Sequence, residues 1–158
     1  MNEVSINKDK KLSEHFTLGE LTKTSYHTLG GNIPSHVAIG NLTRLCLWLE
    51  LLRERYNRLY GDATREIPVV ITSGYRSEEV NRLCGGAKGS NHLTGCAVDI
   101  RCAGPEQMIR YACILLDTAD ENGWELDELI QEKRGTTYWV HFAVRPKDNR
   151  RKILFDCR

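Results

Sequence analysis

The sequence predicts an α+β domain in which helices pack on a mainly antiparallel sheet. Helical patterns come first along the chain, and strand-like runs then alternate with helical ones, an order that suggests this class. A length of 158 residues suits one domain. We therefore expect a flexible polar segment over residues 1–12, followed by a single folded domain over residues 13–158.

Capping residues and apolar spacing predict four helices, over residues 17–22, 35–61, 78–84 and 105–123. The first starts with a hydroxyl and carries a carboxylate three positions later, which is a capping box. The second has the longest stripe of apolar residues at three- and four-residue steps. The third follows a serine that can cap it and stops at a Gly-Gly pair. The fourth has a proline in its first turn.

Strand-like composition predicts five strands, over residues 67–72, 96–101, 126–132, 137–144 and 153–155. The last would be an edge strand. Successive side chains of a strand point to opposite faces of its sheet. The second strand therefore places Ala97 and Asp99 on one face, and Val98 and Ile100 on the other.

Composition argues against two kinds of partner. A net charge of +1 gives no electrostatic reason to expect nucleic acid as the main partner. No run of roughly 18 apolar residues is present, so we expect no membrane span.

The N-terminal residues lack the apolar segment of a signal peptide, which predicts synthesis in the cytoplasm. The six cysteines form no Cys-x-x-Cys pair, and free thiols are expected.

The stretch over residues 90–99 suggests a metal site together with the later His141. An imidazole and a carboxylate, His92 and Asp99, flank a turn of small residues that leads into a strand. Two histidines and one carboxylate form a standard catalytic zinc set, with the fourth position open for water. A carboxylate in an otherwise apolar strand would be costly without a partner. We expect these three residues to bind Zn²⁺, with Cys96 as a softer alternative ligand.

Several motifs resemble the M15 family of zinc peptidases, the D-alanyl-D-alanine carboxypeptidases and related cell-wall endopeptidases. The family pattern Ser-x-His-x-x-Gly-x-Ala-x-Asp stands complete over residues 90–99. Residues 139–141 are similar to its Trp-x-His ending, and residues 73–77 to its Ser-Gly-Tyr-Arg-Ser run. Residues 15–22 resemble the start of a phage and bacterial subgroup. The resemblance implies a hedgehog/DD-peptidase-like fold and supports the zinc ligands.

The same resemblance implies two substrate-binding residues. Arg76 would bind a carboxylate of the substrate, a role that suits a planar guanidinium with a permanent charge. Ser90 would form a hydrogen bond close to the site.

The general base is harder to assign by resemblance. Many family members carry an acidic residue three positions before the last histidine, where this chain has Tyr138. Residues 127–132 resemble the strand of a subgroup in which an acid ends that strand. We therefore predict Glu132 as the catalytic base, with Asp127 and Glu128 as alternatives.

The resemblance implies a zinc metallopeptidase that hydrolyses peptidoglycan stem peptides, as a D-Ala-D-Ala carboxypeptidase or as an endopeptidase. It would be a monomer that acts on the cell wall after release from the cytoplasm, which fits a phage or prophage lysis enzyme (an endolysin). The alternative is a non-catalytic, zinc-containing binding module of the same fold, resembling the signalling domain of hedgehog proteins. The tyrosine at position 138 favours that alternative.

Overall fold

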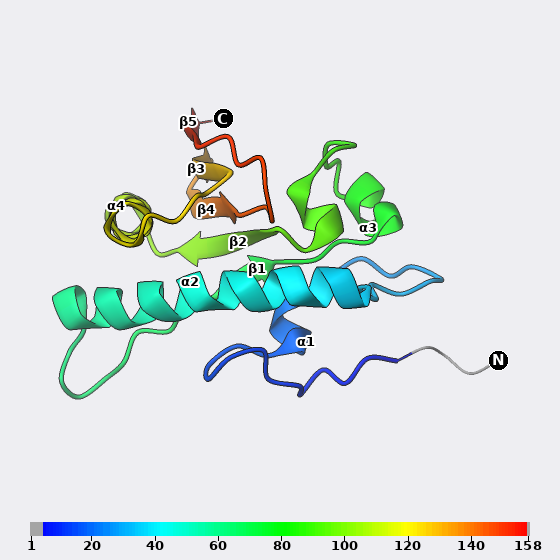
Figure 1. Ribbon diagram of the computed structural model, residues 1–158, viewed down its shortest axis with the longest axis horizontal. Coiled ribbons are helices and arrows are strands. Elements are labelled where there is room, and N and C mark those ends of the chain that lie inside the picture. The colour runs from blue at the N-terminus through cyan, green and yellow to red at the C-terminus, as the bar shows by residue number, and fades with distance from the viewer. Residues whose placement is uncertain (1–4, 158) are drawn as a thin grey trace.

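The computed structural model describes residues 5–157 and confirms the α+β class (Figure 1). The helical elements are α1 (Leu18–Leu21), α2 (His36–Tyr60), α3 (Glu78–Leu83), the 3-10 turn η1 (Asn91–Thr94) and α4 (Pro105–Asn122). The strands are β1 (Ile71–Ser73), β2 (Ala97–Cys102), β3 (Glu128–Arg134), β4 (Thr137–Ala143) and β5 (Lys152–Cys157). Residues 1–4, which belong to the predicted flexible segment, lie outside the described residues.

The five strands form one sheet in the order β1-β2-β4-β3-β5. The pairs β1–β2, β2–β4 and β3–β4 are antiparallel. Strand β5, at the edge, runs parallel to β3 and is the exception. The sheet is therefore mostly antiparallel, as predicted. The strand predicted over residues 67–72 is observed as the shorter β1, because pairing with β2 begins at Ile71.

Local capping explains where the helices begin and end. Thr17 and Glu20 form the predicted capping box at α1: the Thr17 hydroxyl accepts the Glu20 N–H, and the Glu20 carboxylate accepts the Thr17 N–H. Ser35 caps α2 by accepting the N–H of Ala38, and this helix ends at Gly61. The longest helix therefore has the bounds that its flanking residues predict.

The segment before α1 is held by backbone hydrogen bonds. The N–H of Gly19 donates to the Lys8 carbonyl (2.9 Å), and the N–H of Leu18 donates to the Lys10 carbonyl (2.8 Å). The side chain of Ile6 also packs against the core. This segment thus covers one side of α1.

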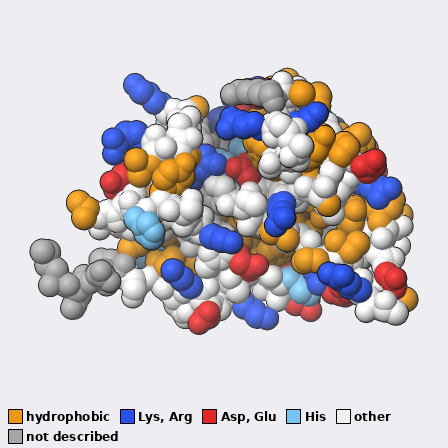
Figure 2. All heavy atoms as spheres, turned by 180° about the vertical axis from the view of Figure 1, so that it is seen from behind, with side chains coloured by type: hydrophobic (Ala, Val, Ile, Leu, Met, Phe, Trp, Pro, Cys, Tyr) orange, Lys and Arg blue, Asp and Glu red, His pale blue; other side chains and the backbone are white. Residues whose placement is uncertain are grey.

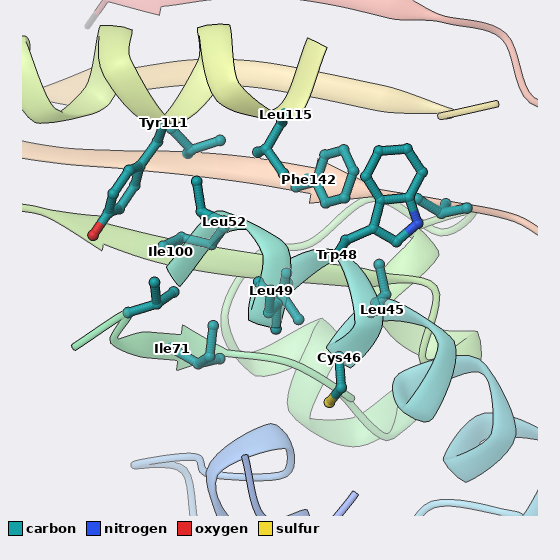
Figure 3. Packing of buried hydrophobic residues seen from close by; sticks show 14 of the residues in the cluster. Leu45, Cys46, Trp48, Leu49, Leu52, Ile71, Ile100, Tyr111, Leu115 and Phe142 are labelled. Carbon is teal, nitrogen blue, oxygen red and sulfur yellow. The ribbon is translucent and has the colours of Figure 1, made fainter. Parts of the chain in front are cut away.

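Helices α2 and α4 cover one face of the sheet and bury it. Figure 3 shows side chains from both helices meeting side chains from β1, β2 and β4. Trp48 of α2 packs edge-on against Phe142 of β4, with ring centroids 5.1 Å apart. Tyr111 of α4 packs in the same way on Tyr56 of α2, at 4.9 Å. This core fixes the sheet and leaves its other face free of these helices.

Alternation along the strands decides what lies on the second face. In β2 and β4, Ile100, Val140 and Phe142 belong to the buried core, so Asp99 and His141 project from the opposite face. The polar residues of the predicted site therefore lie on the side away from α2 and α4.

The molecular surface agrees with the near-neutral net charge. In the view from behind, Lys and Arg side chains are interspersed with Asp and Glu side chains, and no large region of one sign is visible (Figure 2). Among the described residues, no helix combines the length and the apolar character needed to cross a membrane.

Leu49 tests the packing of α2 on the sheet. Leu49→Ala should lower the free energy of unfolding by about 2–5 kcal/mol, because it removes buried apolar contacts and leaves a cavity. Leu47→Ala is the control: Leu47 lies on the same helix, is 57% exposed, and should change stability by less than about 0.5 kcal/mol. Urea denaturation followed by circular dichroism compares them, and equal losses would contradict this packing.

Candidate metal centre

The register of the sheet brings a carboxylate and an imidazole together. Asp99 of β2 is the direct cross-strand partner of His141 of β4, and both side chains project from the same face. The Asp99 Oδ1 atom lies 3.0 Å from His141 Nδ1. Residues 42 positions apart in the chain therefore meet because the two strands pair at this register.

His92 reaches the same carboxylate from the turn that precedes β2. Ser90 is the N-cap of η1, and its hydroxyl accepts the N–H of His92 (3.3 Å). Gly95 ends the turn with φ +71°, and a Cβ there would lie 2.5 Å from the Ala38 carbonyl oxygen of α2. Only glycine fits that close approach. The turn places His92 Nε2 3.4 Å from Asp99 Oδ1.

Hydrogen bonds determine which nitrogen each imidazole offers. His92 Nδ1 donates to the Gly74 carbonyl oxygen (2.6 Å), which leaves Nε2 to face Asp99. In His141 the roles are reversed: Nε2 donates to the carboxylate of Glu128 (3.0 Å), and Nδ1 faces Asp99. Metal-binding histidines commonly donate their second ring nitrogen to an oxygen in this way. The hydrogen bonds therefore orient the two rings so that Nε2 of His92 and Nδ1 of His141 both face Asp99.

The three side chains fit a divalent metal ion. One ligand atom each from His92, Asp99 and His141 lies within 4.8 Å of the others, so this group could hold a metal. Tetrahedral zinc with bonds of roughly 2.0–2.2 Å would put neighbouring ligand atoms roughly 3.3–3.6 Å apart. The distances of 3.4 and 3.0 Å from Asp99 Oδ1 are close to that value. The alternative ligand Cys96 lies outside the group, with its sulfur 3.9 Å from the Thr94 carbonyl oxygen.

Charge around the site favours a carboxylate that stays ionised. Burial opposes the charge on Asp99, but the neighbouring His92 and His141 outweigh it and lower the pKa of Asp99 well below its usual range. The Arg76 guanidinium adds an ion pair with Asp99 Oδ2 at 2.9 Å. Burial also opposes protonation of His141, yet its hydrogen bonds to Asp99 and Glu128 raise its pKa to about 9. The ionised Asp99 is therefore the group that His92, His141 and Arg76 all face.

A cleft of about 740 Å³ opens over these residues, a size that suits a small ligand or a peptide segment. Its lining includes the predicted site residues Arg76, Ser90 and Glu132. Arg76 donates through Nε to Ser73 and through Nη2 to Asp99, and its Nη1 forms no hydrogen bond within residues 5–157. The structure thus gathers all the predicted site residues around one opening.

The three candidate bases differ sharply in their surroundings. The side chain of Asp127 is fully buried and accepts hydrogen bonds from Arg150 and Asn91. The Glu128 carboxylate accepts hydrogen bonds from His141, Asn91 and Arg150. Its pKa is lowered to about 2; the hydrogen bond from His141 contributes most to this, and partial burial opposes it. Glu132 is half-buried, and burial followed by the charge of Asp99 raises its pKa.

Position along β3 also distinguishes Glu128 from Glu132. Ile130 of β3 is the direct partner of His141, so Glu128 and Glu132 flank that histidine diagonally on the cleft face. Glu128 contacts the imidazole, whereas Glu132 pairs across the ladder with Trp139 and faces the open cleft. Both carboxylates line the cleft, and Glu132 differs from Glu128 in that its pKa is raised rather than lowered.

Sequence reasoning missed the polar residues that surround the ligands. Asn91 donates to both Asp127 and Glu128, and Arg150 bridges the same two carboxylates. The predicted alternation of β3 could have placed Glu128 on the face of Glu132. Nothing in the basic run over residues 145–152 singled out Arg150.

Comparison with known families agrees with this geometry. The sequence model of the family described as Peptidase M15 matches residues 14–131, which is well over half of the chain. The match includes His92 and Asp99 and ends before His141. No curated protein matches the chain.

Asp127 should make stability depend on acid pH. Burial opposes its charge, but hydrogen bonds from Arg150 and Asn91 lower its pKa to about 2, against an ordinary value near 4. Its ionised form should therefore contribute stability above about pH 4, and this contribution should disappear as the pH falls through about 2. Asp127→Asn should cost on the order of 2 kcal/mol near neutral pH.

Urea denaturation in the presence of a chelator, repeated between about pH 2 and pH 7, measures this difference. The gap between the wild type and Asp127→Asn should be constant above about pH 4 and shrink below it. Asp120→Asn removes a solvent-exposed pair with Arg151 and should cost less than about 1 kcal/mol. A gap as large near pH 2 as near pH 7 would contradict the assignment.

Proposed function

Because the chain belongs to the peptidase M15 family, we propose that it is a zinc-dependent peptidase with His92, Asp99 and His141 as the metal ligands. One observation carries this proposal. His141 lies outside the matched range, yet its Nδ1 faces the same Asp99 oxygen as His92 does. Three protein ligands and a cleft above them leave one side of a metal accessible, which is the arrangement of catalytic zinc. We further propose that residues 13–158 act as one domain.

Bound zinc would supply Lewis acidity and a lowered pKa for water at the site. The residues of the chain would supply orientation and proton transfer. We propose that Glu132 accepts a proton from the attacking water and passes it to the leaving amine. Its position on the cleft face and its raised pKa support that role, because a base works best when its pKa approaches the working pH.

Arg76 is the proposed contact for a substrate carboxylate. Its Nε and Nη2 atoms are held by Ser73 and Asp99, so the guanidinium is oriented before the substrate arrives. Its Nη1 atom remains for a carboxylate. Ser90 would act at the cleft wall next to His92.

The proposed substrates are peptidoglycan stem peptides, hydrolysed as by a D-Ala-D-Ala carboxypeptidase or an endopeptidase. The substrate class rests on the family, and the cleft supports it by combining a carboxylate-binding cation with a proton acceptor. Such a chain would act on the cell wall after release from the cytoplasm, as an endolysin does.

Metal content tests the ligand set. Wild-type protein should bind about one zinc per chain, and His92→Ala or Asp99→Ala should reduce this well below one, because two ligands hold the ion poorly. His36→Ala is the control, since His36 is exposed at the start of α2. Elemental analysis after dialysis measures the content. Full zinc retention in both site variants would remove these ligands from the proposal.

Glu132→Gln tests the base. The variant should keep its zinc and lose roughly 10²–10⁴-fold in turnover, because the amide cannot accept the proton. Glu106→Gln, at an exposed position in the first turn of α4, should leave turnover unchanged. Mass spectrometry of purified muropeptides measures both rates. Normal rates in Glu132→Gln would assign the base to another group.

The same digest separates a peptidase from a binding module of this fold. A peptidase should create new peptide termini, and chelation should stop their appearance. A fully zinc-loaded wild type that yields no product from any wall type would favour the binding module.

A further inference from the structure

A group of five polar residues lies next to the proposed metal ligands, and three of them (Asn91, Glu128 and Arg150) also line the cleft. We call it the brace: Asn91, Asp127, Glu128, Arg145 and Arg150. These residues come from η1, from the start of β3, and from the segment that follows β4. They lie in three separate segments of the sequence, and the fold brings them into contact.

The brace begins at a buried carboxylate. The side chain of Asp127 is fully buried, and Arg150 donates to both of its oxygens, from Nε to Oδ1 (3.0 Å) and from Nη2 to Oδ2 (2.7 Å). Such a two-point contact is among the stronger polar interactions in proteins. Arg145 adds an ion pair at 3.2 Å. The buried charge is thus compensated on several sides.

From there the brace reaches both histidines. Arg150 Nη2 also donates to Glu128 Oε1 (2.9 Å), and the other oxygen of Glu128 accepts His141 Nε2 (3.0 Å). Asn91, the residue next to His92, donates to Asp127 (2.8 Å) and Glu128 (3.0 Å). One connected set of hydrogen bonds therefore holds the turn that carries one histidine and the strand that carries the other.

The backbone around Arg150 supports a specific role. Asp148 and Arg151 adopt positive φ values of 58° and 49°, which side chains other than glycine rarely adopt. Such conformations persist where surrounding contacts impose them, and they occur often near functional sites. The N–H of Arg150 also donates to Asp127 Oδ1 (3.0 Å). The loop is thus bent in a way that delivers the guanidinium to the two carboxylates.

We propose that Glu128 and Arg150 are positioning residues for the metal site: Glu128 fixes the ring and tautomer of His141, and Arg150 fixes Glu128. Neither residue would coordinate the ion, although both lie at the wall of the cleft. Binding through His141 Nδ1 requires the proton to sit on Nε2, and Glu128 is its acceptor. The proposal rests on the metal ligands proposed above. It predicts that the affinity for metal depends on Arg150, which reaches His141 through Glu128.

Two pairs of matched variants test this. Glu128→Leu removes the acceptor and should weaken Zn²⁺ binding by roughly 10–100-fold, whereas Glu128→Gln keeps an acceptor oxygen and should retain most of the affinity. Arg150→Gln should weaken binding in the same direction by a smaller factor. Arg151→Gln is its control, because the neighbouring arginine pairs with the exposed Asp120 and should not change affinity.

The measurements are zinc titration against a chromophoric chelator and the visible absorption spectrum of the Co²⁺ form. A disturbed His141 should change the cobalt spectrum in Glu128→Leu and Arg150→Gln, and circular dichroism should show both variants folded. If Glu128→Leu does not fold, the Zn²⁺ affinities of Arg150→Gln and Arg151→Gln are compared instead, and a loss confined to Arg150→Gln supports the positioning role.

Three results would overturn the proposal: wild-type affinity in Glu128→Leu, equal losses in Glu128→Leu and Glu128→Gln, or equal effects at Arg150 and Arg151. Failure of the wild type itself to bind Zn²⁺ or Co²⁺ would instead overturn the proposed metal site, and the positioning role with it.

Discussion

The pairing of Asp99 with His141 across β2 and β4 is the constraint on which the site depends. It is a property of the backbone register, and a slip of one residue would send one of the two side chains to the core face. The core residues on the other face oppose such a slip, because they would have to move out of contact with α2 and α4. Packing on one face therefore fixes the chemistry on the other.

The third residue of the group depends on the same carboxylate. His92 comes from a turn whose path needs Gly95 against α2, and it points at the oxygen that His141 faces. Asp99 is thus a buried charge between two imidazoles, with Arg76 on its second oxygen. A buried charge is tolerated when it is paired and hydrogen-bonded on all sides. A divalent ion would complete that compensation, which agrees with membership of a peptidase family.

Much of the local structure could be predicted from the sequence, because caps and periodicity are local signals. The capping box at Thr17 and the bounds of α2 follow from neighbouring residues, and the structure confirms both. The faces of β2 also followed from alternation. The resemblance over residues 90–99 singled out His92 and Asp99, and the structure brings both together with His141.

What could not be predicted depends on neighbours in space. Alternation assigns a side chain to a face, but the order of strands decides which faces meet, and β5 joins β3 in parallel without any local signal. The contact between Glu128 and His141 requires the β3–β4 register as well as the alternation. Arg150 lies in a basic run typical of a solvated loop, and only the path of that loop brings it to Asp127.

The most direct measurement is an anomalous difference map at the zinc edge from crystals of the zinc-loaded protein. We expect one peak at roughly 2.0–2.2 Å from His92 Nε2, Asp99 Oδ1 and His141 Nδ1, with the cleft side of the ion free of protein atoms. A peak elsewhere in the molecule, or a fourth protein atom that closes the coordination, would contradict the account.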